Sequence, residues 1–167
     1  MDERLETLAQ RTGQWLRTHG WRLATAESCT GGWIAETVTA IAGSSDWFGC
    51  GWVTYSNAAK VRQLDVPATL IDAQGAVSEA VVAAMVRGAL ARSDAQVALA
   101  VSGIAGPTGG SPGKPVGTVC FAWGGPGAAV RTQTCRFAGD REQVRRQSVI
   151  HALEGLLQAD TTAKSVP

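Results

Sequence analysis

The stretch Ala26–Gly32, AESCTGG, gathers two hydroxyl groups and a thiol in one short turn between two apolar segments. Serine and cysteine side chains act as nucleophiles in hydrolytic enzymes once a neighbouring base removes the proton. Ser28 or Thr30 could instead cap the helix that follows, a common use of a hydroxyl group. A cap alone does not account for Gly31 and Gly32, because each glycine weakens a helix by about 1 kcal/mol relative to alanine. The turn is therefore a candidate site for chemistry.

Lys60, in the stretch Tyr55–Lys60, YSNAAK, offers a base for such a nucleophile. Ser56 or Asn57 is expected to cap the next helix, which puts Lys60 in its first turn. The helix dipole disfavours a positive charge there, and partial burial would lower the pKa of the amine further. A neutral amine can accept a proton from a serine hydroxyl. The alternative is a solvated surface lysine.

Two other segments could take part. The segment 102–115, SGIAGPTGGSPGKP, is a long loop after an apolar run, and such loops are often functional. It contains neither GK[ST] nor GxGxxG, so it is neither a Walker A loop nor a GxGxxG loop, and the alternative is a flexible connector. Arg141 is expected in the first turn of the last helix, either as a cation for an anionic substrate group or as a surface arginine.

Histidine-based mechanisms are disfavoured, because the chain has only two histidines and neither lies in a motif. His19 is expected at the end of the first helix and His151 inside the last one, so neither a Ser-His-Asp triad nor a pair with Cys29 is predicted. What remains is a serine nucleophile with a lysine base. The four cysteines lie far apart, which predicts reduced thiols in a cytoplasmic protein. No ligand cluster has metal-binding spacing, so neither a metal nor a cofactor is expected.

Hydrophobic periodicity predicts alternating helices and strands. Helices are expected at 2–19, 30–40, 57–64, 78–93 and 141–157, and strands at 21–26, 48–55, 97–103, 118–123 and 128–137. The last two strands should pair as a hairpin. Gly20 should end the first helix, Ser78 should cap the fourth, and Asp140 with Gln143 should form a capping box. This order predicts an α/β fold, a three-layer α/β/α sandwich with a mixed sheet.

Length and charge bound the class of protein. The 167 residues suit one domain, expected over 1–160, and residues 161–167 are expected to fray. The net charge of +1 predicts no nucleic-acid partner, and no apolar run is long enough for a membrane span. The six tryptophans favour a homodimer or higher homo-oligomer, because aromatic residues are enriched at interfaces.

The three motifs together resemble the CinA C-terminal domain family over nearly the whole chain. TAESCTGG at 25–32, VTYSNAAK at 53–60, and SGIAGPTGG with KPVGTV at 102–119 carry the resemblance. The resemblance implies a three-layer fold like an anticodon-binding domain. It also implies hydrolysis of nicotinamide mononucleotide, a small-molecule nucleotide, to nicotinate mononucleotide and ammonia, in pyridine nucleotide recycling.

The resemblance also implies roles for residues that match the family's motifs. Ser28 corresponds to the nucleophile, Lys60 to its base, and Tyr55 to a tyrosine that assists proton transfer or orientation. Arg141 corresponds to a basic site residue, and Ser102 stands where many relatives have threonine. Substrate-binding residues are expected to be Thr30, Gly31, Gly32, Asn57, Ser102, Gly103 and Arg141, the two glycines through an oxyanion hole or a phosphate contact.

Two competing functions remain open. One is a non-enzymatic nucleotide-binding or interaction module of competence or DNA-damage pathways, which the neutral charge balance disfavours only for direct DNA binding. The other is an amidase with a different substrate, because the shape of the loops and of the pocket rim decides specificity.

Overall fold

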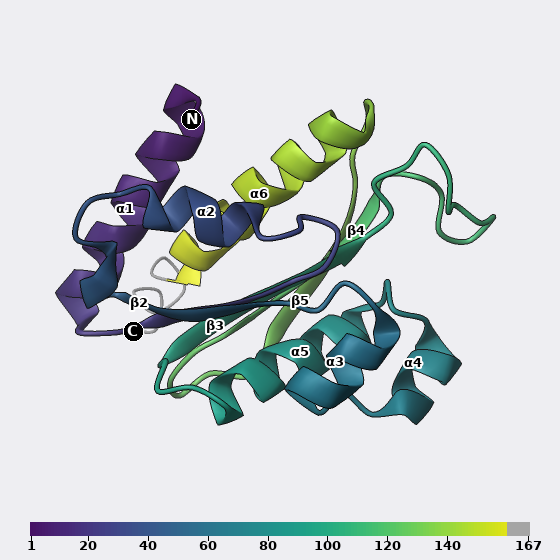
Figure 1. Ribbon diagram of the computed structural model, residues 1–167, viewed down its shortest axis with the longest axis horizontal. Helices are drawn as coiled ribbons and strands as arrows, with labels where there is room; N and C mark the ends of the chain where they lie inside the picture. The colour runs from purple at the N-terminus through teal and green to yellow at the C-terminus, as the bar shows by residue number, and fades with distance from the viewer. Residues whose placement is uncertain (160–167) are drawn as a thin grey trace, which may run out of the picture.

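A five-stranded mixed sheet forms the centre of the computed structural model, which describes residues 1–159 (Figure 1). The strands are β1 (Leu23–Glu27), β2 (Phe48–Val53), β3 (Val97–Gly103), β4 (Thr118–Gly124) and β5 (Arg131–Arg136), in the order β2-β1-β3-β4-β5. β1 pairs in parallel with β2 and with β3, whereas β4 pairs antiparallel with β3 and with β5. The predicted mixed sheet and hairpin are confirmed. The tail expected to fray, 161–167, lies outside the described residues.

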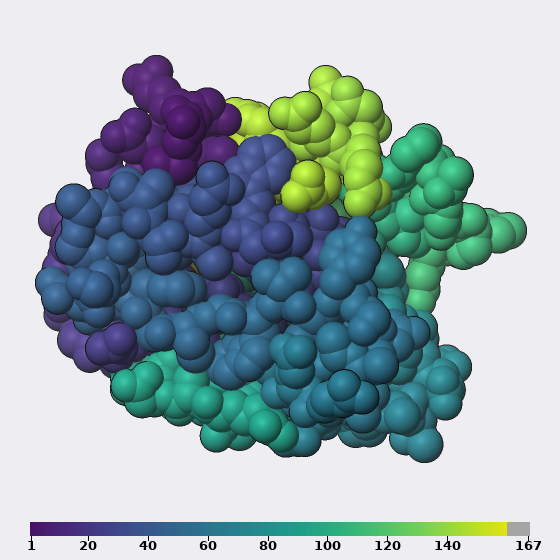
Figure 2. Space-filling view, in the orientation of Figure 1, coloured from purple at the N-terminus to yellow at the C-terminus, as the bar shows by residue number. Residues whose placement is uncertain are grey.

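Helices cover both faces of this sheet, which confirms the predicted three-layer α/β/α fold (Figure 1). On one face lie α1 (Glu3–His19), α2 (Trp33–Thr39) and α6 (Arg141–Leu157), and on the other lie α3 (Asn57–Leu64), α4 (Ala68–Gln74) and α5 (Glu79–Ala91). A short 3-10 turn, η1 (Ser44–Asp46), precedes β2. The loop between β3 and β4 projects from the body of the molecule (Figure 2). Within residues 1–159, no helix combines the length and apolarity that a membrane crossing needs.

The two faces of the sheet carry side chains of different size, because successive residues of a strand point to opposite faces. Leu99 and Phe121 belong to the core beneath α1, α2 and α6, whereas Ala98 and Ala100 belong to the core beneath α5. Bulky side chains thus fill one layer, and small ones let α5 pack close to the strands.

Most helix ends lie where the sequence predicts them. Asp140 and Gln143 form the capping box of α6, and the Ser78 hydroxyl caps α5. Gly20 ends α1 with a left-handed backbone, at φ 64°. Asp2 caps the other end of α1 by accepting a hydrogen bond from the Leu5 N–H.

Two helices differ from the prediction. α2 begins at Trp33 and not at residue 30, because Gly31 and Gly32 have φ of 62° and 101° and such left-handed residues cannot extend a right-handed helix. α4, which is short and lies between Pro67 and Gly75, was not predicted from the sequence. A helix of this length gives too few apolar repeats for periodicity to reveal it.

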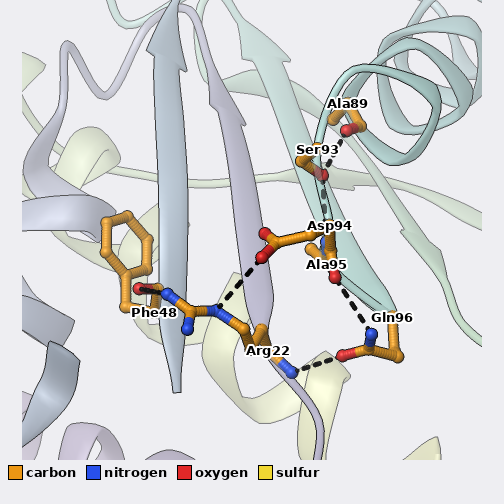
Figure 3. Close-up of polar contacts among 7 residues, drawn as sticks. All are labelled: Arg22, Phe48, Ala89, Ser93, Asp94, Ala95 and Gln96. Carbon is orange, nitrogen blue, oxygen red and sulfur yellow. Dashed lines mark hydrogen bonds and ion pairs between the residues drawn. The ribbon is translucent and has the colours of Figure 1, made fainter. Parts of the chain in front are cut away.

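Polar contacts around Arg22 join the amino ends of the parallel strands (Figure 3). Arg22 Nη2 donates to the Phe48 carbonyl at 3.2 Å, and the Arg22 backbone N–H donates to Gln96 Oε1 at 2.8 Å. The Asp94 carboxylate lies 4.0 Å from Arg22 Nε. These contacts connect the starts of β1, β2 and β3, so the strands are held together at the end opposite to their carboxyl termini.

A substitution at Gly88 tests how closely α5 packs against α3, the helix that carries Lys60. A Cβ at Gly88 would overlap the Leu64 carbonyl oxygen, which is backbone and cannot rotate away. We expect Gly88→Ala to lower the free energy of unfolding by about 1–3 kcal/mol despite the better helix propensity of alanine. Urea denaturation measures this change. Gly113→Ala is the control, because no atom lies within 4 Å of its new methyl group, and equal stability of the two variants would contradict the packing argument.

Candidate active site

The candidate site lies where the carboxyl ends of β1 and β3 meet. Ser28 directly follows β1, and its backbone N–H donates to the Val101 carbonyl of β3 at 3.0 Å. The chain leaves β1 for β2 on one side and later reaches β3 on the other side. The boundary between β1 and β3 is therefore a topological switch point, the usual place for ligands in open α/β sheets.

Lys60 and Ser28 form the polar centre of this site. Lys60 Nζ lies 3.1 Å from Ser28 Oγ, 2.8 Å from the Thr54 carbonyl oxygen and 3.5 Å from the Tyr55 carbonyl oxygen. Lys60 is 1% exposed and Ser28 is 7% exposed. The predicted helix over 57–64 is confirmed as α3, and the Ser56 side chain caps it. The alternative of a solvated surface lysine is therefore wrong.

The surroundings of Lys60 favour its neutral form. Burial lowers the pKa of the Lys60 amine. Within residues 1–159 no carboxylate forms an ion pair with Lys60 that would oppose this effect. A neutral amine has two N–H groups for the two carbonyl oxygens and one lone pair for the Ser28 hydroxyl proton. The ammonium form satisfies the same three neighbours by donating to all of them, so the contacts hold Lys60 in place both before and after it accepts the Ser28 proton.

Cys29, the other nucleophile in the turn, lies in an unsuitable environment. It is 6% exposed, and burial raises the pKa of its thiol to about 12. The thiol is therefore protonated near neutral pH and provides no thiolate for attack. The two histidines lie elsewhere, since His19 contacts the Trp15 carbonyl oxygen and His151 contacts Gln133 and Cys135.

Glu27, not a hydroxyl group, caps the helix after the turn. Its buried carboxylate accepts hydrogen bonds from the N–H groups of Ile34 and Ala35 at 2.9 and 3.0 Å, and from the Thr30 hydroxyl at 2.7 Å. Burial raises the pKa of the Glu27 carboxyl, and these hydrogen bonds lower it in part. The interpretation of Ser28 or Thr30 as the cap of α2 is therefore wrong, and the Ser28 hydroxyl is left to face Lys60.

Arg141 connects three walls of the site. Its Nη1 donates to the Gly106 carbonyl of the β3–β4 loop at 2.9 Å, and its Nη2 donates to the Tyr55 hydroxyl at 3.1 Å. Tyr55 is 60% exposed. The arginine therefore ties the start of α6 to the loop after β3 and to the segment after β2.

The site residues proposed from the sequence line two cavities that share Arg141. One cavity, of about 210 Å³, is lined by Ser28, Cys29, Tyr55, Asn57, Lys60, Ala76, Val77, Ser102, Gly103, Ala105 and Arg141. The other, of about 550 Å³, is lined by Thr30, Gly31, Gly32, Trp33, Glu36, Arg141, Glu142 and Arg145. Within residues 1–159 no group of His, Cys, Asp or Glu side chains is placed to hold a metal ion.

Two residues of the site have no counterpart in the sequence analysis. Glu27 lies next to Ser28, but a carboxylate at the end of a strand gives no sign that it will cap a helix several residues later. Arg145 donates from Nε to the Cys29 carbonyl and from Nη2 to the Thr30 carbonyl, both at 3.1 Å. Its spacing of four residues from Arg141, which puts both on one face of a helix, is the signal that could have found it.

Comparison with known proteins places the chain in a family. Residues 5–159 match the CinA C-terminal domain. The chain belongs to the CinA C-terminal domain family. The resemblance read from the three sequence motifs is thereby confirmed.

Members of this family and solved structures resemble the chain over most of its length. The Pseudomonas putida protein named nicotinamide-nucleotide amidohydrolase PncC is 60% identical, and the match covers 94% of this chain and 98% of that protein. The Escherichia coli (strain K12) protein of the same name is 49% identical, and the match covers 94% of this chain and 95% of that protein. The crystal structure of competence/damage inducible protein CihA from Agrobacterium tumefaciens matches with a TM-score of 0.93 and 42% sequence identity. The match covers 96% of this chain and 98% of that chain.

The pKa of Cys29 leads to a labelling prediction. At pH 8 a thiol with a pKa of about 12 is ionised in roughly one molecule in 10,000. We expect iodoacetamide to leave Cys29 unmodified in the native protein and to alkylate it in guanidinium chloride, as measured by peptide mass spectrometry. The half-buried Cys50 is the internal control and should react sooner in the native protein. Fast alkylation of native Cys29 would show that the thiol is reactive after all.

Proposed function

We propose that this chain hydrolyses the amide of nicotinamide mononucleotide to nicotinate mononucleotide and ammonia, with Ser28 as nucleophile and Lys60 as base. The observation that carries the proposal is the buried contact of 3.1 Å between Lys60 Nζ and Ser28 Oγ. The names of the relatives from Pseudomonas putida and Escherichia coli support the choice of substrate.

The reaction proceeds in two halves. Neutral Lys60 accepts the Ser28 proton while Oγ attacks the carboxamide carbon, and the resulting ammonium group returns the proton to the nitrogen of the leaving group. Ammonia departs, and an ester joins Ser28 to the nicotinate carbonyl. Water then attacks this ester with Lys60 again as base, which restores the Ser28 hydroxyl and releases the carboxylate. The sum is one amide and one water converted to one carboxylate and one ammonium ion.

A negative charge develops on the carbonyl oxygen in both halves, and donors must face it. The Gly31 N–H donates to the Ser28 carbonyl at 3.0 Å, so this amide is already engaged. The buried Ser102 hydroxyl lines the same cavity as Ser28 and is the donor we assign to the oxyanion. Losing one such donor typically costs about 10²–10³-fold in kcat.

The two cavities divide the substrate between them. The smaller one, which contains Ser28, takes the carboxamide end of the nicotinamide ring. The larger one, bordered by Arg141 and by Gly31–Gly32, takes the ribose phosphate. Arg141 borders both cavities and supplies positive charge for the phosphate.

Ser28→Ala and Cys29→Ala form a matched pair that tests the nucleophile. We expect Ser28→Ala to lower ammonia release from nicotinamide mononucleotide by about 10³-fold or more, because no other group can form the ester. Cys29→Ala should keep most of the activity, because its thiol is protonated. A coupled assay for ammonia measures both, and circular dichroism checks the fold. Loss of activity in the cysteine variant alone would move the nucleophile to Cys29, whereas an inactive parent protein would favour the non-enzymatic alternative.

Lys60 leads to a prediction about pH. The rate requires the neutral amine, so kcat should rise with pH through an apparent pKa below the usual value of about 10.4. Because arginine keeps its proton in this range, Lys60→Arg should lose about 100-fold or more and should show no such rise. Arginine is also bulkier than lysine, so its burial could lower activity by itself. Lys60→Met, which is uncharged and of similar length, removes the base without adding a buried cation and should be as inactive as Lys60→Arg. If Lys60→Arg deamidates at close to the parental rate, Lys60 binds substrate and another group is the base.

A further inference from the structure

We infer that Arg145 is a positioning residue that fixes the Ser28 turn for attack, a role that rests on the proposed function. The turn runs from Ser28 to Gly32 and holds the nucleophile beside Lys60. Arg145 belongs to α6, more than a hundred residues away in the chain, yet its guanidinium group contacts the backbone of this turn.

The contacts of Arg145 are directed at two consecutive carbonyl groups. Nε donates to the Cys29 carbonyl at 3.1 Å and Nη2 donates to the Thr30 carbonyl at 3.1 Å. A guanidinium group offers such paired donors in a rigid fork, and hydrogen bonds from a charged donor are stronger than neutral ones. The guanidinium carbon also lies 5.4 Å from the centre of the Trp33 ring, the first residue of α2. Arg145 thereby fixes both the turn and the start of the helix after it.

The other side of the turn is held by an opposite charge. The buried Glu27 carboxylate accepts from the Thr30 hydroxyl and from two amides of α2, while Arg145 donates to carbonyl groups. Two left-handed glycines, Gly31 and Gly32, lie between these contacts. Glycine has the widest choice of backbone conformations, so this segment needs external contacts to keep one shape. Glu27 and Arg145 supply contacts of both kinds, to N–H groups and to C=O groups.

Arg145 and Arg141 act from one face of α6, because they lie four residues apart. Arg141 contacts the β3–β4 loop and the Tyr55 hydroxyl, and Arg145 contacts the Ser28 turn. The neighbouring Arg146 points elsewhere and forms an ion pair with Asp2 at 2.7 Å. Within this helix, Arg145 is therefore the residue that links α6 to the backbone of the nucleophile turn.

Arg145→Met tests this role, with Arg146→Met as the matched control on the same helix. We expect Arg145→Met to lower kcat for nicotinamide mononucleotide by about 100-fold, because a small displacement of the nucleophile costs about that much. KM should rise by a smaller factor, because Arg145 also borders the cavity assigned to the ribose phosphate. Hydrogen exchange gives a second readout that is independent of activity. The amides of Gly31 and Trp33, which donate to carbonyl groups within the turn, should exchange faster in Arg145→Met and not in Arg146→Met.

Arg145→Lys is the third variant. If Arg145→Met fails to fold, kcat and hydrogen exchange of Arg145→Lys still test the role of Arg145. It keeps the charge but offers a single point donor in place of a fork, so kcat and exchange should lie between those of the parent and Arg145→Met. A higher KM with unchanged kcat and exchange would overturn the proposal and make Arg145 a substrate-binding group. Parental kcat and exchange in a folded Arg145→Lys would overturn it as well. If the parent protein releases no ammonia, the proposed function fails, and the exchange experiment still decides the role of Arg145.

Discussion

The contact between the Lys60 amine and the Ser28 hydroxyl needs a dry pocket, because burial is what lowers the pKa of the amine. An amine taken out of water is tolerated only when its hydrogen-bonding groups find partners. Here the partners are the Thr54 and Tyr55 carbonyl oxygens and the Ser28 hydroxyl, and no carboxylate in residues 1–159 pairs with the charge. A carboxylate partner would stabilise the ammonium form and work against a base. The candidate site is therefore polar without being acidic at its centre.

The order of the strands explains how this pocket forms at the end of the sheet. β1 lies between β2 and β3, so the segments that follow all three strands converge. The segment after β1 brings Ser28, the segment after β2 leads to Lys60, and the end of β3 brings Ser102. Arg22 and its partners connect the opposite ends of the same strands, so these polar contacts lie away from the pocket.

Much of the fold was predictable from the sequence because its signals are local. The caps of α5 and α6 and the glycine after α1 depend on residues only a few positions away, and each was found. The start of α2 was misplaced because Gly31 and Gly32 are left-handed, and because the residue that accepts from the first N–H groups of the helix is Glu27 at the end of β1 and not a neighbour of the helix. The motif residues Ser28 and Lys60 could be selected as a pair by elimination. Their distance and burial could not be predicted, because both depend on how β1, β2 and α3 pack.

Arg145 shows which part of the site the sequence leaves open: its spacing from Arg141 indicates the face of α6 on which it lies, but not the groups that it contacts. Its partners are backbone carbonyl groups, which every residue possesses, so their chemistry leaves no trace in the sequence. The contact also joins residues more than a hundred positions apart, from the turn after β1 to the last helix. Such a contact forms only when α6 has packed onto its face of the sheet beside α1 and α2 (Figure 1). Ser28, in the turn after β1, and Lys60, on α3, meet at the end of the sheet. The contacts that hold the backbone of the Ser28 turn are complete only when the last helix is in place, so the geometry of the site depends on the whole domain and not on its first half.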